Sequence, residues 1–183
     1  MLNKSFDTAG PTTAAIAMAT AKGETYPGVR SLGAWNGVED DGGIVFTDML
    51  TVGGLCTCKL DSDGTPGLED PNTVAQIVAD VTSIWAASSI QVGPYKYFSQ
   101  QQVFEHRLGV AWMLYLPQTL TVDQVPEAGA LIPVMDGKKR KGTVVISVAD
   151  ETFSADNLEH VKLANAIEVR LADQGLLPQF TDL

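Results

Sequence analysis

The segment that most constrains the fold is residues 109–116, GVAWMLYL, because it is apolar at nearly every position. A strand buried on both faces has such a continuous apolar run, whereas a half-exposed strand alternates apolar and polar residues. Two further strand-like segments follow at residues 130–135 and 142–148, separated by the basic turn DGKKRKG. The sequence therefore predicts a central strand beside a hairpin, in which Pro133 indicates an edge strand or a bulge.

Two segments have the pattern of amphipathic helices. In the first, at about residues 70–89, Asp70 is a suitable N-cap, Pro71 takes the first helical position, and apolar residues then recur at helical spacing. The second, at residues 157–173, opens near Asp156 and ends near Gly175. Its predicted buried stripe consists of Leu163, Ala164, Ile167 and Leu171. The fold class we expect is α+β, with a largely antiparallel central sheet packed by these two main helices.

The first 70 residues are expected to form a loop-rich, acidic half of one domain that spans residues 1–183. A short amphipathic helix is predicted after Thr12 or Thr13. Strands are predicted at residues 44–52 and 54–60, followed by a turn-rich loop. A further short strand is predicted at residues 94–98.

The charge balance restricts the partners. The chain carries 22 acidic and 12 basic side chains, for a net charge of −10, so it repels nucleic acid and anionic membranes and attracts basic proteins. No stretch approaches the roughly 20 apolar residues of a membrane span. Cys56 and Cys58 are predicted to be reduced thiols packed as small hydrophobes. A cytoplasmic protein is expected.

Catalytic and metal-binding patterns are weak. The sequence from Asp61 to Gly64 resembles the start of a calcium loop, but Pro66 and Asn72 stand where that loop needs glycine and glutamate, so we expect no metal site. His106 lies beside Glu105, and a general acid or base there is conceivable, although no local signature supplies a nucleophile. An enzyme or small-molecule binder with a site near these two residues is the alternative function. The expectation is a protein without catalytic residues or cofactor.

Binding residues are predicted in the acidic loops. Trp35, in the glycine-flanked sequence GAWNG, is a candidate aromatic anchor. Tyr115 lies three residues after Trp112, on the opposite face of the strand, and is expected to direct its hydroxyl group toward a rim. The acidic candidates are Glu39, Asp40, Asp41, Asp61 and Asp63. The basic cluster at residues 138–141 is expected to be a solvated turn rather than a nucleic-acid contact.

Three motifs resemble the C-terminal half of the immunity protein 52 family: WMLYLP at residues 112–117, VPEA at 125–128 and ANAIEVRL at 164–171. The resemblance extends from Trp112 to the end of the chain and is much looser before it. Family members are bacterial antitoxins encoded beside polymorphic toxins, including nuclease effectors of type VI secretion systems. Glu168 and Arg170 belong to the third motif, and the resemblance leaves open whether they hold the fold or touch the toxin.

The resemblance implies a cytoplasmic immunity protein that neutralises a cognate toxin by direct stoichiometric binding. A nuclease must present a cationic surface to its phosphate substrate, and an acidic inhibitor is complementary to that surface. A structural or chaperone-like secretion accessory is the third possibility, which an oligomer or filament of the isolated protein would favour.

Overall fold

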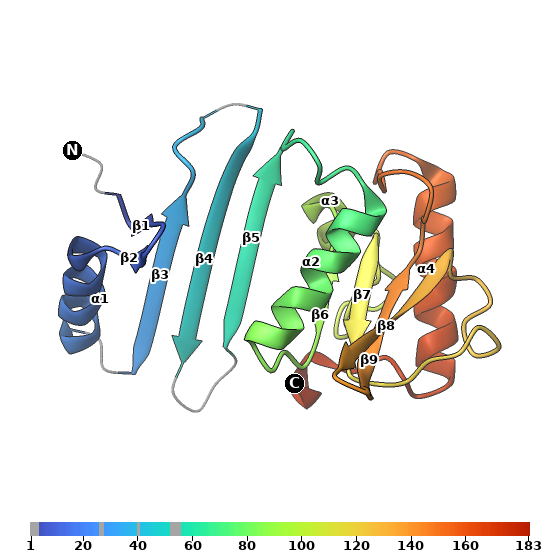
Figure 1. The fold of residues 1–183 in the computed structure, drawn as a ribbon. Helices are drawn as coiled ribbons and strands as arrows, with labels where there is room; N and C mark the ends of the chain where they lie inside the picture. Colours follow the sequence, from blue (N-terminus) through green and yellow to red (C-terminus); the bar gives the residue numbers. More distant parts are fainter. Residues whose placement is uncertain (1–3, 26–27, 40, 52–55) are drawn as a thin grey trace. The chain divides into compact units, whose positions relative to one another are not determined.

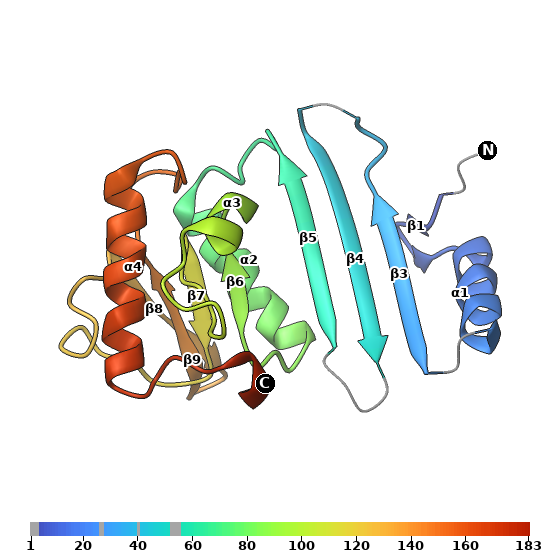
Figure 2. The same ribbon diagram turned by 180° about the vertical axis from the view of Figure 1, so that it is seen from behind.

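A computed structural model describes residues 4–25, 28–39, 41–51 and 56–183 of the chain (Figures 1 and 2). Its contacts divide the chain into two compact units, Met1–Pro66 and Gly67–Leu183, which we call unit 1 and unit 2 and describe separately. Both contain helices and antiparallel sheets, which confirms the predicted α+β class. The single domain expected over residues 1–183 stays a prediction.

Unit 1 is built on a three-stranded antiparallel sheet in the order β3-β4-β5, preceded by a two-stranded ribbon and a helix (Figure 1). Its elements are β1 (Phe6–Asp7), β2 (Gly10–Pro11), α1 (Thr13–Thr25), β3 (Val29–Trp35), β4 (Gly43–Thr51) and β5 (Thr57–Asp63).

The helix predicted after Thr12 or Thr13 is present as α1, but its apolar residues do not gather on one face and none of its residues is buried, so the predicted amphipathic character is wrong. The two predicted strands correspond to β4 and β5, and their junction at residues 53–54 lies outside the described residues. The expected loops are wrong in two places, because Trp35 ends β3 and β5 continues through Asp63.

Unit 2 contains a four-stranded sheet in the order β6-β7-β9-β8, in which each adjacent pair is antiparallel. Its elements are α2 (Pro71–Ile84), β6 (Ile90–Val92), α3 (Tyr95–Gln100), β7 (Met113–Leu116), β8 (Ala130–Asp136), β9 (Lys139–Ile146), α4 (Leu158–Asp173) and a 3-10 turn at Phe180–Asp182. Figures 1 and 2 show α2 on one face of this sheet and α4 on the other.

The predicted central strand is confirmed as β7, whose four residues are all fully buried. Because side chains alternate along a strand, Met113 and Tyr115 pack in the cluster that includes residues of α2. Leu114 and Leu116 pack in a second cluster, with Ile167 of α4. A helix on each face therefore explains the continuous apolar run.

Local signals for the helices were largely correct. Asp70 caps α2 by accepting hydrogen bonds from the backbone N–H groups of Asn72 and Thr73. The α2 helix ends at Ile84, however, before the predicted residue 89. In α4 the N-cap is Asn157 rather than Asp156, and the helix stops just before Gly175, whose φ of 68° is accessible to glycine without strain.

Three smaller predictions had different outcomes. Pro133 lies on the edge strand β8 just before a bulge, as expected. The strand predicted at residues 94–98 is wrong, because Pro94 instead caps the short helix α3. Leu163 is 40% exposed and does not belong to the buried stripe of α4.

Among the described residues, no helix is both long enough and apolar enough to cross a bilayer. Cys56 and Cys58 are exposed rather than packed in a core, contrary to the prediction. Burial of part of its side chain, together with the charge of Asp48, raises the pKa of the Cys58 thiol.

Candidate binding surface

The sheet of unit 1 brings together predicted residues that are distant in sequence. Trp35 of β3 pairs with Val45 of β4, and Val45 pairs with Asp61 of β5. Residues directly opposite each other on neighbouring strands project from the same face of a sheet. Trp35, Val45 and Asp61 therefore form one row across the sheet. We call this side the Trp35 face; by alternation it also carries Thr47, Met49, Thr57, Lys59 and Asp63.

The apolar side chains of the Trp35 face are open to solvent. Trp35 is 40% exposed, Val45 44% and Met49 41%. No described residue of unit 1 is buried, so these side chains do not belong to a closed core. Single exposed apolar residues are ordinary, but adjacent ones with a polar rim are typical of protein interaction sites.

Acidic groups lie at one end of this face. The loop between β3 and β4 carries the exposed residues Glu39 and Asp41. The Cβ atom of Asp41 lies 3.1 Å from the point where a side chain on Gly64 would begin, so this loop lies against the end of β5, next to Asp63. Asp40 lies outside the described residues.

The same loop is held beside Trp35 by Asn36. Its side-chain amide donates to the carbonyl oxygen of Gly42 at 2.7 Å, and its Oδ1 accepts from the backbone N–H groups of Val38 and Ile44 at 3.1 Å each. The structure thus places Trp35 and the acidic loop residues Glu39 and Asp41 at one end of the sheet. Sequence analysis missed Val45 and Met49, although the alternation of Val45, Thr47 and Met49 was a usable signal.

Lys59 and Asp61 form an ion pair of 2.8 Å along β5. Both side chains are more than half exposed, so the pair contributes little to stability. Lys59 also places a basic side chain among the predicted acidic residues Asp61 and Asp63.

The prediction that Tyr115 reaches a rim is wrong. Its strand, β7, lies in the interior of the sheet of unit 2, and Tyr115 is fully buried. Burial raises the pKa of its phenol group, which makes no hydrogen bond within the part of the chain that the structure describes. Tyr115 is therefore a core residue and cannot contact a partner directly.

Glu168 is also fully buried, so direct contact with a toxin is excluded for it too. One carboxylate oxygen accepts hydrogen bonds from the Tyr97 hydroxyl at 2.7 Å and from the backbone N–H of Val110 at 2.8 Å. The other oxygen accepts from the N–H of Val103 at 2.8 Å. Burial raises the pKa of this carboxyl group, against the lowering effect of these hydrogen bonds. Of the two roles left open for Glu168, the structure supports the structural one: it fastens residues 103–110 to α4.

Three further residues of the resembling motifs, Arg170, Glu127 and Trp112, form hydrogen bonds within unit 2. Arg170 of α4 donates from Nε to a carboxylate oxygen of Glu127 at 3.0 Å, which joins the second motif to the third. This bond is the main reason that the pKa of the Glu127 carboxyl group is lowered. The Trp112 indole N–H donates to the carbonyl oxygen of Val148 at 2.9 Å. Trp112 and Glu168 therefore serve the packing of unit 2, whereas Arg170 is exposed and joins the second motif to the third.

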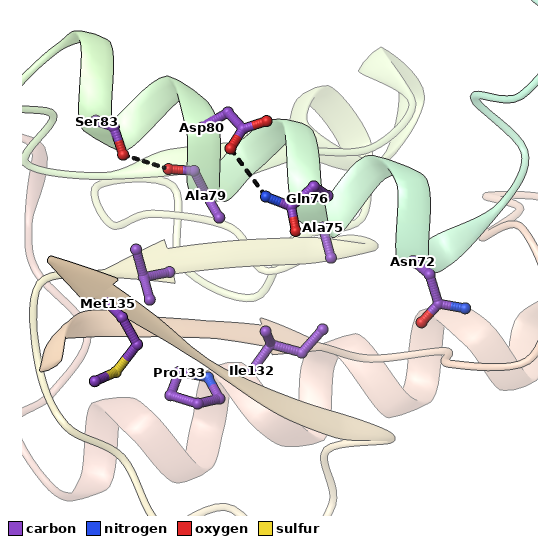
Figure 3. Close-up of a pocket in the computed structure, with 10 residues that line it drawn as sticks. Asn72, Ala75, Gln76, Ala79, Asp80, Ser83, Ile132, Pro133 and Met135 are labelled. Atoms are coloured by element: carbon purple, nitrogen blue, oxygen red, sulfur yellow. Dashed lines mark hydrogen bonds between the residues drawn. The ribbon is translucent and has the colours of Figure 1, made fainter. Parts of the chain in front are cut away.

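Glu105 and His106, the residues of the alternative site, line neither of two cavities in the described part of the chain. Both residues are exposed. A cavity of about 440 Å³ lies between α2 and β8, where Gln76 and Asp80 face Ile132 and Met135 (Figure 3). Another, of about 490 Å³, lies between α1 and the strands β3 and β4.

His160 and two residues of the basic cluster lie within hydrogen-bonding distance of groups in unit 2. His160 is buried, and its Nε2 atom lies 3.0 Å from a carboxylate oxygen of Glu151. In the basic cluster, Arg140 donates to the Leu120 carbonyl oxygen at 3.0 Å, and Lys141 donates to the Thr82 carbonyl oxygen near the end of α2. Among the described residues, no three His, Cys, Asp or Glu side chains lie together in a way that could hold a metal ion.

Comparison of the chain with known protein families and with curated proteins finds no match. The resemblance to the immunity protein 52 family therefore stays a prediction, and the function is argued from the surface itself.

Proposed function

We propose that this chain is an immunity protein that acts in the cytoplasm and neutralises a cognate bacterial toxin, a type VI secretion nuclease effector, by direct stoichiometric binding. The toxin contacts the Trp35 face. The observation that carries the proposal is the exposed row of Trp35 and Val45, with Met49 on the same face and Asp61, Asp63 and Asp41 at its border.

This arrangement has the parts that a tight interface needs. Binding energy is concentrated in a few large anchors, with tryptophan among the most frequent, and a polar rim surrounds them. Acidic side chains at the rim accelerate encounter with a cationic nuclease. Protection at nanomolar affinity requires about −12 kcal/mol, which exposed ion pairs alone do not supply. The apolar side chains of Trp35 and Val45 would therefore supply the part of the binding free energy that the acidic rim does not.

The test is a binding measurement with the product of the neighbouring gene, made catalytically inactive and shown to be folded. We expect one toxin molecule to bind per copy of the wild-type chain. Trp35→Ala should raise the dissociation constant about thirtyfold, which corresponds to about 2 kcal/mol for an anchor. Trp85→Ala is the matched control, because Trp85 is similarly exposed, at 41%, but lies in unit 2.

Two results would contradict the proposal in different ways. If the wild-type chain does not bind the folded neighbour, the immunity function is wrong. If it binds and Trp35→Ala binds equally well, the function stands but the toxin uses another surface.

A further inference from the structure

Within unit 1, no described strand pairs with the outer edge of β5, the last strand of the sheet. β5 ends the strand order β3-β4-β5, and all seven of its residues are exposed. An edge strand presents unpaired backbone N–H and C=O groups, which another strand can bind. Proline, bulges and charged side chains are common protections of such an edge, and the charges of β5, at Lys59, Asp61 and Asp63, oppose its pairing with a strand of unmatched charge. β5 contains no proline, and its pairing with β4 has no break in register.

The register identifies which residues direct their backbone groups to this edge. The N–H of Asn36 bonds to the carbonyl oxygen of Ile44, so the even-numbered residues of β4 bond to β3. Since successive residues of a strand direct their backbone groups to opposite sides, the odd-numbered residues of β4 bond to β5. Their partners on β5 are also odd-numbered, as in the pair Val45 and Asp61. Cys58, Leu60 and Ser62 therefore direct their N–H and C=O groups outward.

The sequence of β5, TCKLDSD, complements itself when it is paired antiparallel about Leu60. In this register Leu60 lies opposite Leu60 of a second copy, and Cys58 lies opposite Ser62 of the second copy, so the outward-facing residues meet as hydrogen-bonded pairs. Lys59 then lies opposite Asp61 of the second copy, and the symmetry repeats this contact. Opposite charges directly across two strands stabilise the pairing.

Neighbouring registers bring like charges together: with the axis through Lys59, Lys59 lies opposite Lys59 of the second copy, and with the axis through Asp61, Asp61 lies opposite Asp61 of the second copy. If the two-fold axis passes through Ser62, Asp61 lies opposite Asp63 of the second copy, and like charges meet. If the axis passes through Cys58, Lys59 lies opposite Thr57 of the second copy, and no ion pair forms across the strands. The axis at Leu60 is therefore the preferred register. There, Leu60, which is 52% exposed, also gains an apolar contact.

We propose that two copies of this chain pair antiparallel through β5, with the two-fold axis at Leu60, and that their unit 1 sheets join into one continuous sheet. Lys59 and Asp61, which form an ion pair within one chain, exchange partners across the axis. The pairing shares Asp61 with the Trp35 row, but dimerisation is measured without toxin, so its failure and the failure of the proposed function are distinguishable.

A charge-exchange experiment tests the pairing directly. Lys59→Asp places Asp opposite Asp across the axis, and Asp61→Lys places Lys opposite Lys. Each variant alone should dimerise at least about tenfold more weakly than wild type in sedimentation equilibrium. An equimolar mixture of the two should recover wild-type affinity, because every contact across the axis is then between opposite charges. Both single variants lose the internal ion pair, so recovery in the mixture reports the contact between chains.

A backbone variant gives a second, independent readout. Leu60→Pro removes an outward N–H without removing a bond to β4, and should abolish the dimer. Leu60→Ala keeps the N–H and should weaken the dimer less. Far-UV circular dichroism checks that each variant is folded; if Leu60→Pro is not, the charge-exchange mixture decides.

Three outcomes would overturn the proposal. The wild-type chain could remain monomeric at its highest soluble concentration. The mixture could fail to recover the dimer that the single variants lose. A dimer could also persist unchanged in the single variants, which would place the interface elsewhere.

Discussion

The two units use the same kind of secondary structure in opposite ways. In unit 2 the strand β7 is fully buried, with α2 on one face of its sheet and α4 on the other. In unit 1 the central strand β4 leaves Val45, Met49 and Leu50 more than 40% exposed, and no described residue is buried. Apolar side chains thus serve the core in unit 2 and remain available to partners in unit 1. The stability of the chain should therefore depend mainly on unit 2, and its binding on unit 1.

Shortening one apolar side chain on an interior strand of each unit tests this division. Of the changes considered, it has the largest expected effect on the free energy of unfolding. Leu114→Ala in β7 should lower the free energy of unfolding by about 2–5 kcal/mol, because it leaves a cavity in a closed core. Val45→Ala in β4 should change it by less than about 1 kcal/mol, because that side chain is already 44% exposed. Urea denaturation measures both. Equal losses would show that unit 1 also contains a stabilising core.

A second comparison between the units replaces one glycine on a strand of each unit with alanine. A Cβ atom on Gly142 of β9 would lie 2.4 Å from the carbonyl oxygen of Leu116, so Gly142→Ala must displace backbone. We expect a loss of about 1–3 kcal/mol. On Gly33 of β3 the nearest atom, the Phe46 carbonyl oxygen, would be 3.8 Å away, so Gly33→Ala should be neutral or stabilise by about 0.4–1 kcal/mol. Thermal unfolding that ranks the two in the reverse order would contradict the packing described for β7 and β9.

Local patterns predicted unit 2 better than unit 1, for physical reasons. The cap at Asp70, the stop at Gly175 and the continuous apolar run of β7 are each determined by a few adjacent residues. The strand β3 was missed because Gly33 and Ser31 interrupt its apolar pattern. Its register with β4 brings Trp35 into one row with Asp61, and no local pattern encodes a contact between residues so far apart in sequence.

Two errors were avoidable. The apolar run that predicted β7 as a central strand also implies that Tyr115 is buried, yet its hydroxyl group was interpreted as a sign of exposure. Glu168 lies four residues after Ala164 and three before Leu171, which places it on the buried stripe of α4. A carboxylate on such a stripe indicates an internal hydrogen-bond partner before it indicates a binding site.

The buried carboxylate of Glu168 makes the stability of unit 2 depend on pH. Its pKa is raised above the ordinary value of 4.5, so the folded state holds this proton more tightly than the unfolded state does. The stabilisation is complete below about pH 4.5 and is lost as pH rises through the folded-state pKa. Glu168→Gln removes this titration and leaves an N–H of Val103 or Val110 without its acceptor, at a cost of about 1–3 kcal/mol. Urea unfolding between about pH 4 and pH 8 should show that the difference in unfolding free energy between wild type and variant decreases as pH rises; a difference that does not change with pH would contradict this role.

The smallest effect on stability is expected from reversing the acidic loop of unit 1. Glu39→Lys together with Asp41→Lys alters two exposed side chains, so the free energy of unfolding should change by less than about 0.5 kcal/mol. The association rate with a cationic toxin should nevertheless fall, and its dependence on salt should weaken, because rim charges act on encounter more than on the formed complex. Glu105→Lys with Asp123→Lys makes the same change in charge at exposed positions of unit 2 and is the control. Stopped-flow binding at two ionic strengths distinguishes the cases. If both double variants slow association equally, net charge is responsible and the loop has no special position; if only the first does, the encounter is directed to the end of the sheet where Trp35 lies.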